Sequence, residues 1–432
     1  MPRTTLARLA GGAALAATLA SAALPAAAAP AWLTLDEAAW RVLQQQGLAH
    51  DAVERHVVRT PAIERGTTQR SPRQDTLVLL RVADDADLPR LSLAAHDALH
   101  RCGGFMAHAT RDDALRTIQR LQARGEGRAA RAQAATAPAY TIDDEAKVQN
   151  LLPRLQDSRI LDTITRLQGY ANRYYRSQTG VKAADDLAQS WSDMAAGRSD
   201  ASVSRFSHPG FPQQSVMLTV RGTTAPDEII VIGGHLDSIS PQAMLRAKGR
   251  APGADDDASG IATLQEVMRV VLASQWKPAR TLQFIGYAGE EAGLLGSKDI
   301  AARYASEGKQ VVGVLQLDMT AYEGSASDIT LISDYTDGAQ DDFVAALASH
   351  YLPELTVTRD VCGYACSDHA SWTAQGYAAS FPFEASFGED NPHIHTPKDK
   401  TDQFGNTASH ALKFAKLALA YAVELGSDAP AR

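Results

Sequence analysis

Residues 228–238 read Glu-Ile-Ile-Val-Ile-Gly-Gly-His-Leu-Asp-Ser, an apolar run that ends at two glycines and is followed by a histidine and an aspartate. A short, continuous run of β-branched residues is typical of a strand that is buried on both faces of a sheet. In open α/β sheets, ligand sites lie at the carboxyl ends of such strands. This stretch therefore predicts an α/β fold with a site that begins at His235.

The chain beyond residue 140 continues this pattern. Three further apolar runs are expected to be strands, at residues 281–287, 311–317 and 328–332. Three segments carry apolar residues at helical spacing, at residues 261–272, 343–351 and 411–425. Strands that alternate with helices predict a mostly parallel mixed β-sheet sandwiched between helices.

Length and composition are those of a globular protein with a sizeable core. The chain has 432 residues, of which 45% are hydrophobic and 21% are charged, close to ordinary usage. Its formal net charge is -8. Because nucleic-acid binding relies on a basic surface, we expect no nucleic-acid partner.

The first 29 residues have the composition of a secretory signal peptide. Arg3 and Arg8 provide a positive start, residues 9–23 are apolar, and residues 25–29 are small. The alternative is a membrane anchor, but the alanine-rich stretch is only weakly hydrophobic. We therefore expect secretion to the periplasm or the medium, with no membrane association after cleavage.

Residues 30–139 predict a small α+β unit followed by a linker. Helical patterns at 33–48 and 113–121 flank one strand-like run at 76–82. Residues 124–139 are mostly Ala, Arg, Gly and Gln and have no apolar period, which indicates an exposed linker. A processing protease would have three candidate cleavage points in it, Arg124, Arg128 and Arg131; the alternative is a connector that is never cut.

The three cysteines are Cys102, Cys362 and Cys366. In an exported protein disulfides persist, and a bridge between Cys362 and Cys366 would pin a tight loop. The alternative for this pair is two free or metal-binding thiols. Cys102 is left unpaired, which fits a segment that is later removed or a cysteine that pairs with another molecule.

Acidic and histidine side chains follow the predicted strands, where parallel strands would bring them to one crevice. They are His235 and Asp237, Glu290 and Glu291, and Asp318. Asp237 stands where a carboxylate can orient a metal-bound imidazole. Glu290 and Glu291 are adjacent and can point different ways, one to a metal and the other to its bound water.

Three consecutive aspartates, residues 255–257, repel one another unless cations neutralise them or the side chains splay apart. The dipole of the following helix explains about one of them. His395 lies in a Pro-punctuated loop together with a competing candidate, His393. Two histidines, three carboxylates and a further glutamate satisfy a two-metal hydrolase, and these ligands favour zinc, with manganese or cobalt as alternatives. The His-Glu-x-x-His and Gly-x-Ser-x-Gly motifs are absent from the sequence.

Six blocks of sequence carry a resemblance to a known family: Gly-Gly-His-Leu-Asp-Ser, Pro-Gly-Ala-Asp-Asp-Asp-Ala-Ser-Gly, Tyr-Ala-Gly-Glu-Glu, Leu-Gln-Leu-Asp-Met-Thr, Cys-Gly-Tyr-Ala-Cys-Ser-Asp-His-Ala-Ser-Trp and Ile-His-Thr. In this order, from about Thr141 to Gly426, the chain resembles the secreted bacterial leucyl aminopeptidases with a co-catalytic di-zinc centre. The resemblance implies a zinc-exopeptidase fold of the phosphorylase/hydrolase-like type.

The resemblance also implies roles for the site residues. Two Zn²⁺ ions per chain would share Asp256, with the remaining ligands divided between them as His235 and Asp318 at one ion and Glu291 and His395 at the other. Glu290 would be the general base, Asp237 would orient His235, and the Tyr364 hydroxyl would help to hold the oxyanion. It further implies a cis peptide after Asp256, a disulfide between Cys362 and Cys366, and an apolar specificity pocket made of Met319, Ile332, Phe381, Phe383, Phe387 and Ile394.

The implied function is a secreted metallo-aminopeptidase that removes bulky apolar first residues, such as Leu, through a metal-bridging water activated by Glu290. Its domains would be a signal peptide (1–29), a propeptide (30–139) and a catalytic domain (140–428). Its partners would be peptides with a free N-terminus and a processing protease, and it would act as a monomer. The alternatives are a carboxypeptidase or glutaminyl-cyclase-type enzyme on the same scaffold, or a binding homologue without catalysis. His393 and Asp390 depart from the family's usual residues, which affects fine specificity.

Overall fold

The computed structural model describes Met1 and residues 31–49, 54–63, 70–83, 87–125, 140–245 and 249–427. The predicted signal peptide, apart from Met1, and residues 126–139 of the predicted linker lie outside the described residues. Within the described part of the chain, no helix combines the length and the apolar character needed to cross a bilayer.

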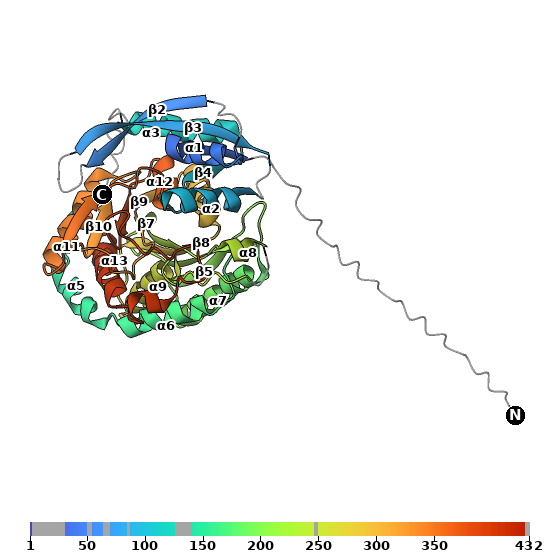
Figure 1. Ribbon diagram of the computed structural model, residues 1–432. Helices are drawn as coiled ribbons and strands as arrows, with labels where there is room; N and C mark the ends of the chain where they lie inside the picture. The colour runs from blue at the N-terminus through green and yellow to red at the C-terminus, as the bar shows by residue number, and fades with distance from the viewer. Residues whose placement is uncertain are drawn as a thin grey trace.

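The larger part of the chain is built around one eight-stranded sheet with the order β11-β10-β12-β9-β7-β8-β6-β5 (Figure 1). Its strands are β5 (Ala201–Phe206), β6 (Ser215–Val220), β7 (Ala225–His235), β8 (Arg280–Tyr287), β9 (Gln310–Gln316), β10 (Ile329–Ile332), β11 (Val357–Asp360) and β12 (Ala379–Phe383). The four central strands β8, β7, β9 and β12 pair with one another in parallel. The pairs β5–β6, β6–β8 and β10–β12 are antiparallel. The predicted mixed, mostly parallel sheet is therefore confirmed.

Helices cover both faces of this sheet. The larger core lies against α6 (Asp157–Gln168), α7 (Gln178–Ala195), α9 (Ala258–Ala273), α11 (Gly338–Tyr351) and α13 (Ser409–Ser427). The opposite face is covered by α10 (Leu295–Ser306) and α12 (His369–Ala374). Strand β7 is apolar without interruption because both of its faces are buried. Ile230 and Ile232 point into the larger core, and Ile229 and Val231 point into the core on the opposite face.

Short elements complete this part of the chain. They are α5 (Glu145–Leu151), α8 (Pro241–Leu245) and the 3-10 turns η2 (Leu152–Arg154), η3 (Glu290–Ala292) and η4 (Thr401–Phe404). The predicted strands correspond to β7, β8, β9 and β10, and the predicted helices to α9, α11 and α13. All seven predictions are confirmed to within a few residues at their ends.

The described residues between 31 and 125 form a separate α+β unit, which we call the N-terminal unit. Its antiparallel sheet has the order β2-β3-β1-β4, with β1 (Ala31–Asp36), β2 (Glu54–Ile63), β3 (Arg70–Val82) and β4 (Phe105–His108). Its helices are α1 (Glu37–Gln45), α2 (Leu88–Leu99) and α3 (Arg111–Gly125). The helix that we predicted from residue 33 was wrong at its start, because Asp36 accepts a hydrogen bond from the Ala39 N–H and so begins the helix after the strand. Helix α3 also runs two residues into the predicted linker.

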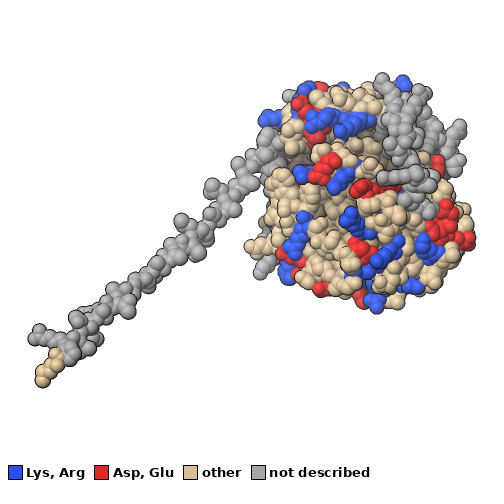
Figure 2. Space-filling view, turned by 180° about the vertical axis from the view of Figure 1, so that it is seen from behind, with Lys and Arg blue, Asp and Glu red and all other residues tan. Residues whose placement is uncertain are grey.

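The N-terminal unit lies on the main sheet at the end where β7 and β8 finish, as the blue to cyan elements at the top of Figure 1 show. The Ala107 N–H donates to the Gly293 carbonyl just after η3, at 3.0 Å. Lys298 Nζ donates to the Ala107 carbonyl and lies 3.5 Å from Asp113 Oδ2. On the face seen in Figure 2, basic and acidic side chains are interspersed over both parts. Polar contacts thus fix the N-terminal unit to the segment that follows β8.

One buried cation holds together the two loops that follow β7. The guanidinium of Arg173 is fully buried and donates to the carbonyl oxygens of Leu236, Pro252 and Gly253 at 2.7, 2.5 and 2.8 Å. Burial lowers the pKa of Arg173, opposed by nearby aspartates such as Asp399. Since these carbonyls belong to the segments that carry His235 and Asp256, Arg173 fixes the relative position of the two.

We expect Arg173→Met to lower the free energy of unfolding by about 3 kcal/mol or more, because it leaves several buried carbonyl groups without a donor. The matched control is Arg166→Met on the exposed side of α6, for which the change should stay within about 0.5 kcal/mol. Urea unfolding followed by tryptophan fluorescence measures both. Equal losses in the two variants would contradict the bracing role of Arg173.

Candidate metal centre

The centre of the site is a carboxylate that faces two histidines. His235 Nε2, at the end of β7, lies 2.9 Å from Asp256 Oδ1. His395 Nε2, from the loop before η4, lies 3.1 Å from Asp256 Oδ2. Each oxygen of the one carboxylate thus faces a different imidazole, which is the arrangement of a bridging ligand between two cations.

The remaining predicted ligands complete two groups around Asp256. Asp318 Oδ1, after β9, lies 3.5 Å from His235 Nε2. Glu291 Oε2, in η3 after β8, lies 2.7 Å from His395 Nε2. The adjacency of β8, β7 and β9 brings their polar ends together, as the sequence predicted. His393 is half-buried and uses its backbone N–H to reach Asn391, so His395 is the histidine whose ring joins the cluster.

The donor atoms suit metal ions better than they suit one another. Among the described residues, buried atoms without a hydrogen-bond partner include Asp256 Oδ1, both carboxylate oxygens of Glu291, Asp318 Oδ1 and His395 Nε2. Buried polar atoms are rarely left in this state. A tetrahedral zinc ion with ligands at about 2.0 to 2.1 Å holds its donor atoms about 3.3 Å apart, close to the separations of 2.7 to 3.5 Å found here. The residues therefore fit a pair of divalent cations.

The electrostatics agree with this fit. Burial raises the pKa of Glu290 well above its usual value and that of Glu291 to about 7. Burial alone would lower the pKa of His395, but the charges of Glu291 and Asp256 beside its ring raise that pKa to about 10. Burial opposes ionisation of Asp256 as well, yet its contacts with His235 and His395 lower its pKa. The cluster draws protons to itself because it holds an excess of negative charge, which divalent cations would neutralise.

Of the three consecutive aspartates, Asp256 is the one whose two oxygens face the rings of His235 and His395. Asp257 caps α9: its Oδ1 accepts from the Gly260 and Met319 N–H groups at 2.8 and 3.2 Å. Its Oδ2 accepts from the His235 N–H at 2.8 Å. The peptide between Asp256 and Asp257 is cis, as the resemblance implied. Splaying the carboxylates relieves the repulsion that their sequence created.

Sequence reasoning missed the carboxylate that holds Asp256 from behind. Asp399 accepts from the backbone N–H groups of Asp255 and Asp256 at 3.0 and 3.2 Å. The Asp255 side chain in turn accepts from the Ala321 N–H and from Asn391 Nδ2 at 3.1 and 3.0 Å. The only sequence signal for Asp399 was its position in the same polar loop as His395.

Asp237, Glu290 and Ser367 surround the outer side of the cluster. Asp237 Oδ1 lies 3.6 Å from His235 Nδ1, and the same carboxylate accepts from the N–H groups of Glu290 and Glu291 at 3.0 and 3.3 Å. Glu290 Oε2 lies 4.0 Å from His235 Nε2 and has no hydrogen-bond partner in the described part of the chain. Ser367, which sequence reasoning also missed, donates to Asp318 Oδ2 at 2.6 Å.

The predicted pocket residues gather beside this cluster. One buried apolar group contains Tyr364 and the disulfide-bonded pair Cys362 and Cys366, with Phe387 packed against it, and its other members are Met319, Ile332, Phe381, Phe383 and Ile394. All of these residues except Cys362 line one cavity, which is also lined by His100 and Cys102 of the N-terminal unit. Its free volume of about 20 Å³ holds little more than one water molecule.

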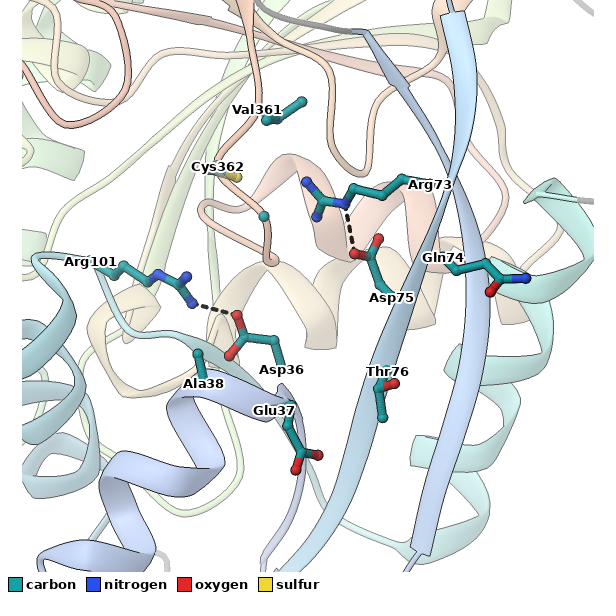
Figure 3. Close-up of a pocket in the computed structure, with 11 residues that line it drawn as sticks. Asp36, Glu37, Ala38, Arg73, Gln74, Asp75, Thr76, Arg101, Val361 and Cys362 are labelled. Carbon is teal, nitrogen blue, oxygen red and sulfur yellow. Dashed lines mark hydrogen bonds and ion pairs between the residues drawn. The ribbon is translucent and has the colours of Figure 1, made fainter.

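A larger cavity of about 410 Å³ opens between the N-terminal unit and the disulfide loop (Figure 3). Arg101 reaches across one side of it to Asp36, and Arg73 pairs with Asp75 on the other, with Cys362 at the rim. Charged side chains of the N-terminal unit therefore line this cavity beside the disulfide loop.

Known proteins match the chain in sequence. The profile of Peptidase family M28 matches residues 215–420. Leucine aminopeptidase 1 of Arthroderma otae is 37% identical over 312 residues, which are 69% of this chain and 81% of the relative. A probable aminopeptidase of Saccharomyces cerevisiae is 33% identical over 304 residues, 68% of this chain and 80% of the relative.

Solved structures match as well. The LapA aminopeptidase of Legionella pneumophila superposes with a TM-score of 0.71 at 29% identity, over 93% of this chain and 100% of that one. A glutaminyl cyclase of Porphyromonas gingivalis shares the fold, with a TM-score of 0.52 at 15% identity, over 63% of this chain and 99% of that one. On the strength of the sequence relatives, matched over four-fifths of their length, this chain belongs to peptidase family M28.

Proposed function

We propose that the chain is a two-zinc aminopeptidase that hydrolyses the first peptide bond of peptides with a bulky apolar N-terminal residue. The observation that carries this proposal is the position of Asp256 between His235 and His395, with one carboxylate oxygen toward each ring. His235 and Asp318 would hold one ion, Glu291 and His395 the other, and Asp256 both. Bound zinc would supply Lewis-acid polarisation of the scissile carbonyl and an acidified water.

The chain's own residues would then move the protons. Glu290 is buried next to the cluster, and its Oε2 is free to accept a proton from the attacking water and to pass one to the leaving amine. Asp237 accepts a hydrogen bond from the backbone N–H of Glu290 and lies beside His235, so it would fix the position of the base relative to that ligand. Tyr364 would donate its hydroxyl to the developing oxyanion.

Specificity would come from two features of the site. An excess of buried carboxylates favours a substrate that brings a positive charge, as the free α-amino group of a peptide does. The adjoining apolar group with its three phenylalanines would take the first side chain. This supports Leu-like first residues, in line with the leucine aminopeptidases among the relatives.

The N-terminal unit would act as a propeptide. Its residues His100 and Cys102 take up space in the apolar cavity, which leaves no room for a leucine side chain. A processing protease that cuts within the linker 124–139 would allow the unit to leave. The Cys362–Cys366 disulfide supports an oxidising compartment and hence secretion, and we propose that the processed protein is a monomer.

The first prediction concerns the reaction. After limited trypsin treatment of the full chain, leucine p-nitroanilide should be hydrolysed, and N-acetyl-leucine p-nitroanilide should not, because acetylation removes the amine. A chelator should abolish the activity and zinc should restore it. If neither substrate is hydrolysed and a peptide with an N-terminal glutamine is cyclised, the chain would instead be a glutaminyl cyclase. The fold is shared with a glutaminyl cyclase of known structure.

The second prediction separates two neighbouring glutamates. Glu290→Gln should lower kcat roughly 100- to 10,000-fold and leave the zinc content unchanged, because it removes a base and no ligand. Glu291→Gln is the matched control and should lower the zinc content itself. Steady-state kinetics and elemental analysis of the same samples measure both; a Glu290→Gln protein with normal turnover would contradict the role of Glu290.

The third prediction concerns Asp399. Because Asp399 holds the backbone of Asp256, Asp399→Ala should weaken zinc binding roughly 10- to 100-fold. Asp402→Ala, three residues away and exposed, should leave it unchanged. Competition against a chromophoric chelator gives the dissociation constants. Similar affinities in the two variants would show that Asp399 does not position the bridging carboxylate.

A further inference from the structure

The turn between α2 and β4 directs one side chain of the N-terminal unit toward the metal cluster. His100, Gly103 and Gly104 adopt positive φ angles of 53°, 56° and 85°. Three left-handed residues in five reverse the chain sharply. Cys102 lies at the tip of this turn, half-buried, and it packs against the apolar group that contains Tyr364.

The sulfur of Cys102 lies within the ligand set of one proposed ion. Cys102 Sγ is 3.8 Å from Asp256 Oδ2, the oxygen that faces His395. This sulfur, an oxygen of Asp256 and a ring nitrogen of His395 all lie within 4.8 Å of one another. A tetrahedral zinc ion with sulfur at about 2.3 Å and oxygen at about 2.0 Å would separate those two atoms by about 3.5 Å. The observed separation therefore suits a shared ion.

The neighbouring donors independently point to an ion at this position. Glu291 is 1% and His395 is 3% exposed. In the described part of the chain, both carboxylate oxygens of Glu291 and Nε2 of His395 have no hydrogen-bond partner. The thiol completes a set of four donors with Asp256, Glu291 and His395. Because Cys362 and Cys366 are bonded to each other, Cys102 is the one cysteine of the sequence that remains as a thiol.

Three contacts lie around the turn. Arg101 Nη1 donates to Asp36 Oδ2 at 2.5 Å, and its guanidinium lies 5.0 Å from the centre of the Tyr364 ring. Figure 3 shows this reach of Arg101 toward Asp36. On the other side, the His96 ring lies 4.4 Å from the ring of His395. The thiol of Cys102 is thus flanked by Arg101, which contacts Tyr364, and by His96, which contacts His395.

We propose that, in the unprocessed chain, the Cys102 thiolate is the fourth ligand of the ion held by Asp256, Glu291 and His395. This inference rests on the proposed function, since it requires the metal centre. Ligation releases the thiol proton to solvent, forms a sulfur–zinc bond, and needs no oxidant or reductant. Structural zinc sites have four protein ligands, whereas catalytic sites keep a position open. Cys102 would therefore close the site until the N-terminal unit is removed.

The test is zinc K-edge X-ray absorption of the full, uncut chain loaded with zinc alone. We expect a sulfur neighbour at about 2.3 Å, one for every two zinc ions, in the wild-type protein. Cys102→Ser should lose this sulfur shell and keep both zinc ions. His100→Asn is the matched control: asparagine tolerates the left-handed turn, so the sulfur shell should remain.

The outcomes separate the inference from the proposed function. Two zinc ions with only nitrogen and oxygen neighbours in the wild-type chain would overturn the Cys102 ligand and leave the metal centre standing. A chain that binds no zinc would overturn both. As a second measurement, the Cys102 thiol should react with a disulfide reagent at least tenfold faster after zinc is removed, and re-added zinc should protect it; equal rates would contradict ligation.

Discussion

The position of Asp256 between two imidazole rings is the constraint on which the rest of the site depends. Two imidazoles approach its two oxygens from segments that are 160 residues apart in the sequence, His235 at the end of β7 and His395 in a late loop. For this to happen, the backbone of Asp256 must be fixed on the side away from the two histidines. Arg173 holds the preceding loop through its carbonyls, and Asp399 holds the N–H of Asp256 itself.

Burying so many carboxylates together is costly unless each has partners. The chain solves this by giving neighbouring acids different tasks. The carboxylates of Asp255 and Asp257 accept hydrogen bonds from backbone and side-chain amide N–H groups. In the described part of the chain, Asp256, Glu291 and Asp318 each have at least one carboxylate oxygen without a hydrogen-bond partner. This division separates the acids that build the loops from those that would hold metal.

Much of the catalytic part could be predicted because its signals are local. The strands β7, β8 and β9 are continuous apolar runs, and the candidate ligands lie at or just after their ends, so topology alone brings His235, Glu291 and Asp318 together. Contacts made at long range left no such signal. Asp399 accepts two hydrogen bonds from the distant backbone of Asp255 and Asp256, and Ser367 donates one to the distant Asp318. The approach of Cys102 to Asp256 spans 154 residues. The strand at Leu33 was mistaken for helix because its apolar spacing continues into α1, and only the cap at Asp36 separates them.

The central claim is that one carboxylate bridges two metal ions. Crystals of the zinc-loaded chain, measured with X-rays at the zinc absorption edge, would locate the ions directly by anomalous diffraction. The account predicts two peaks about 3.5 to 4 Å apart, one on each side of the Asp256 carboxylate. A single peak, or two peaks that do not share Asp256, would contradict it.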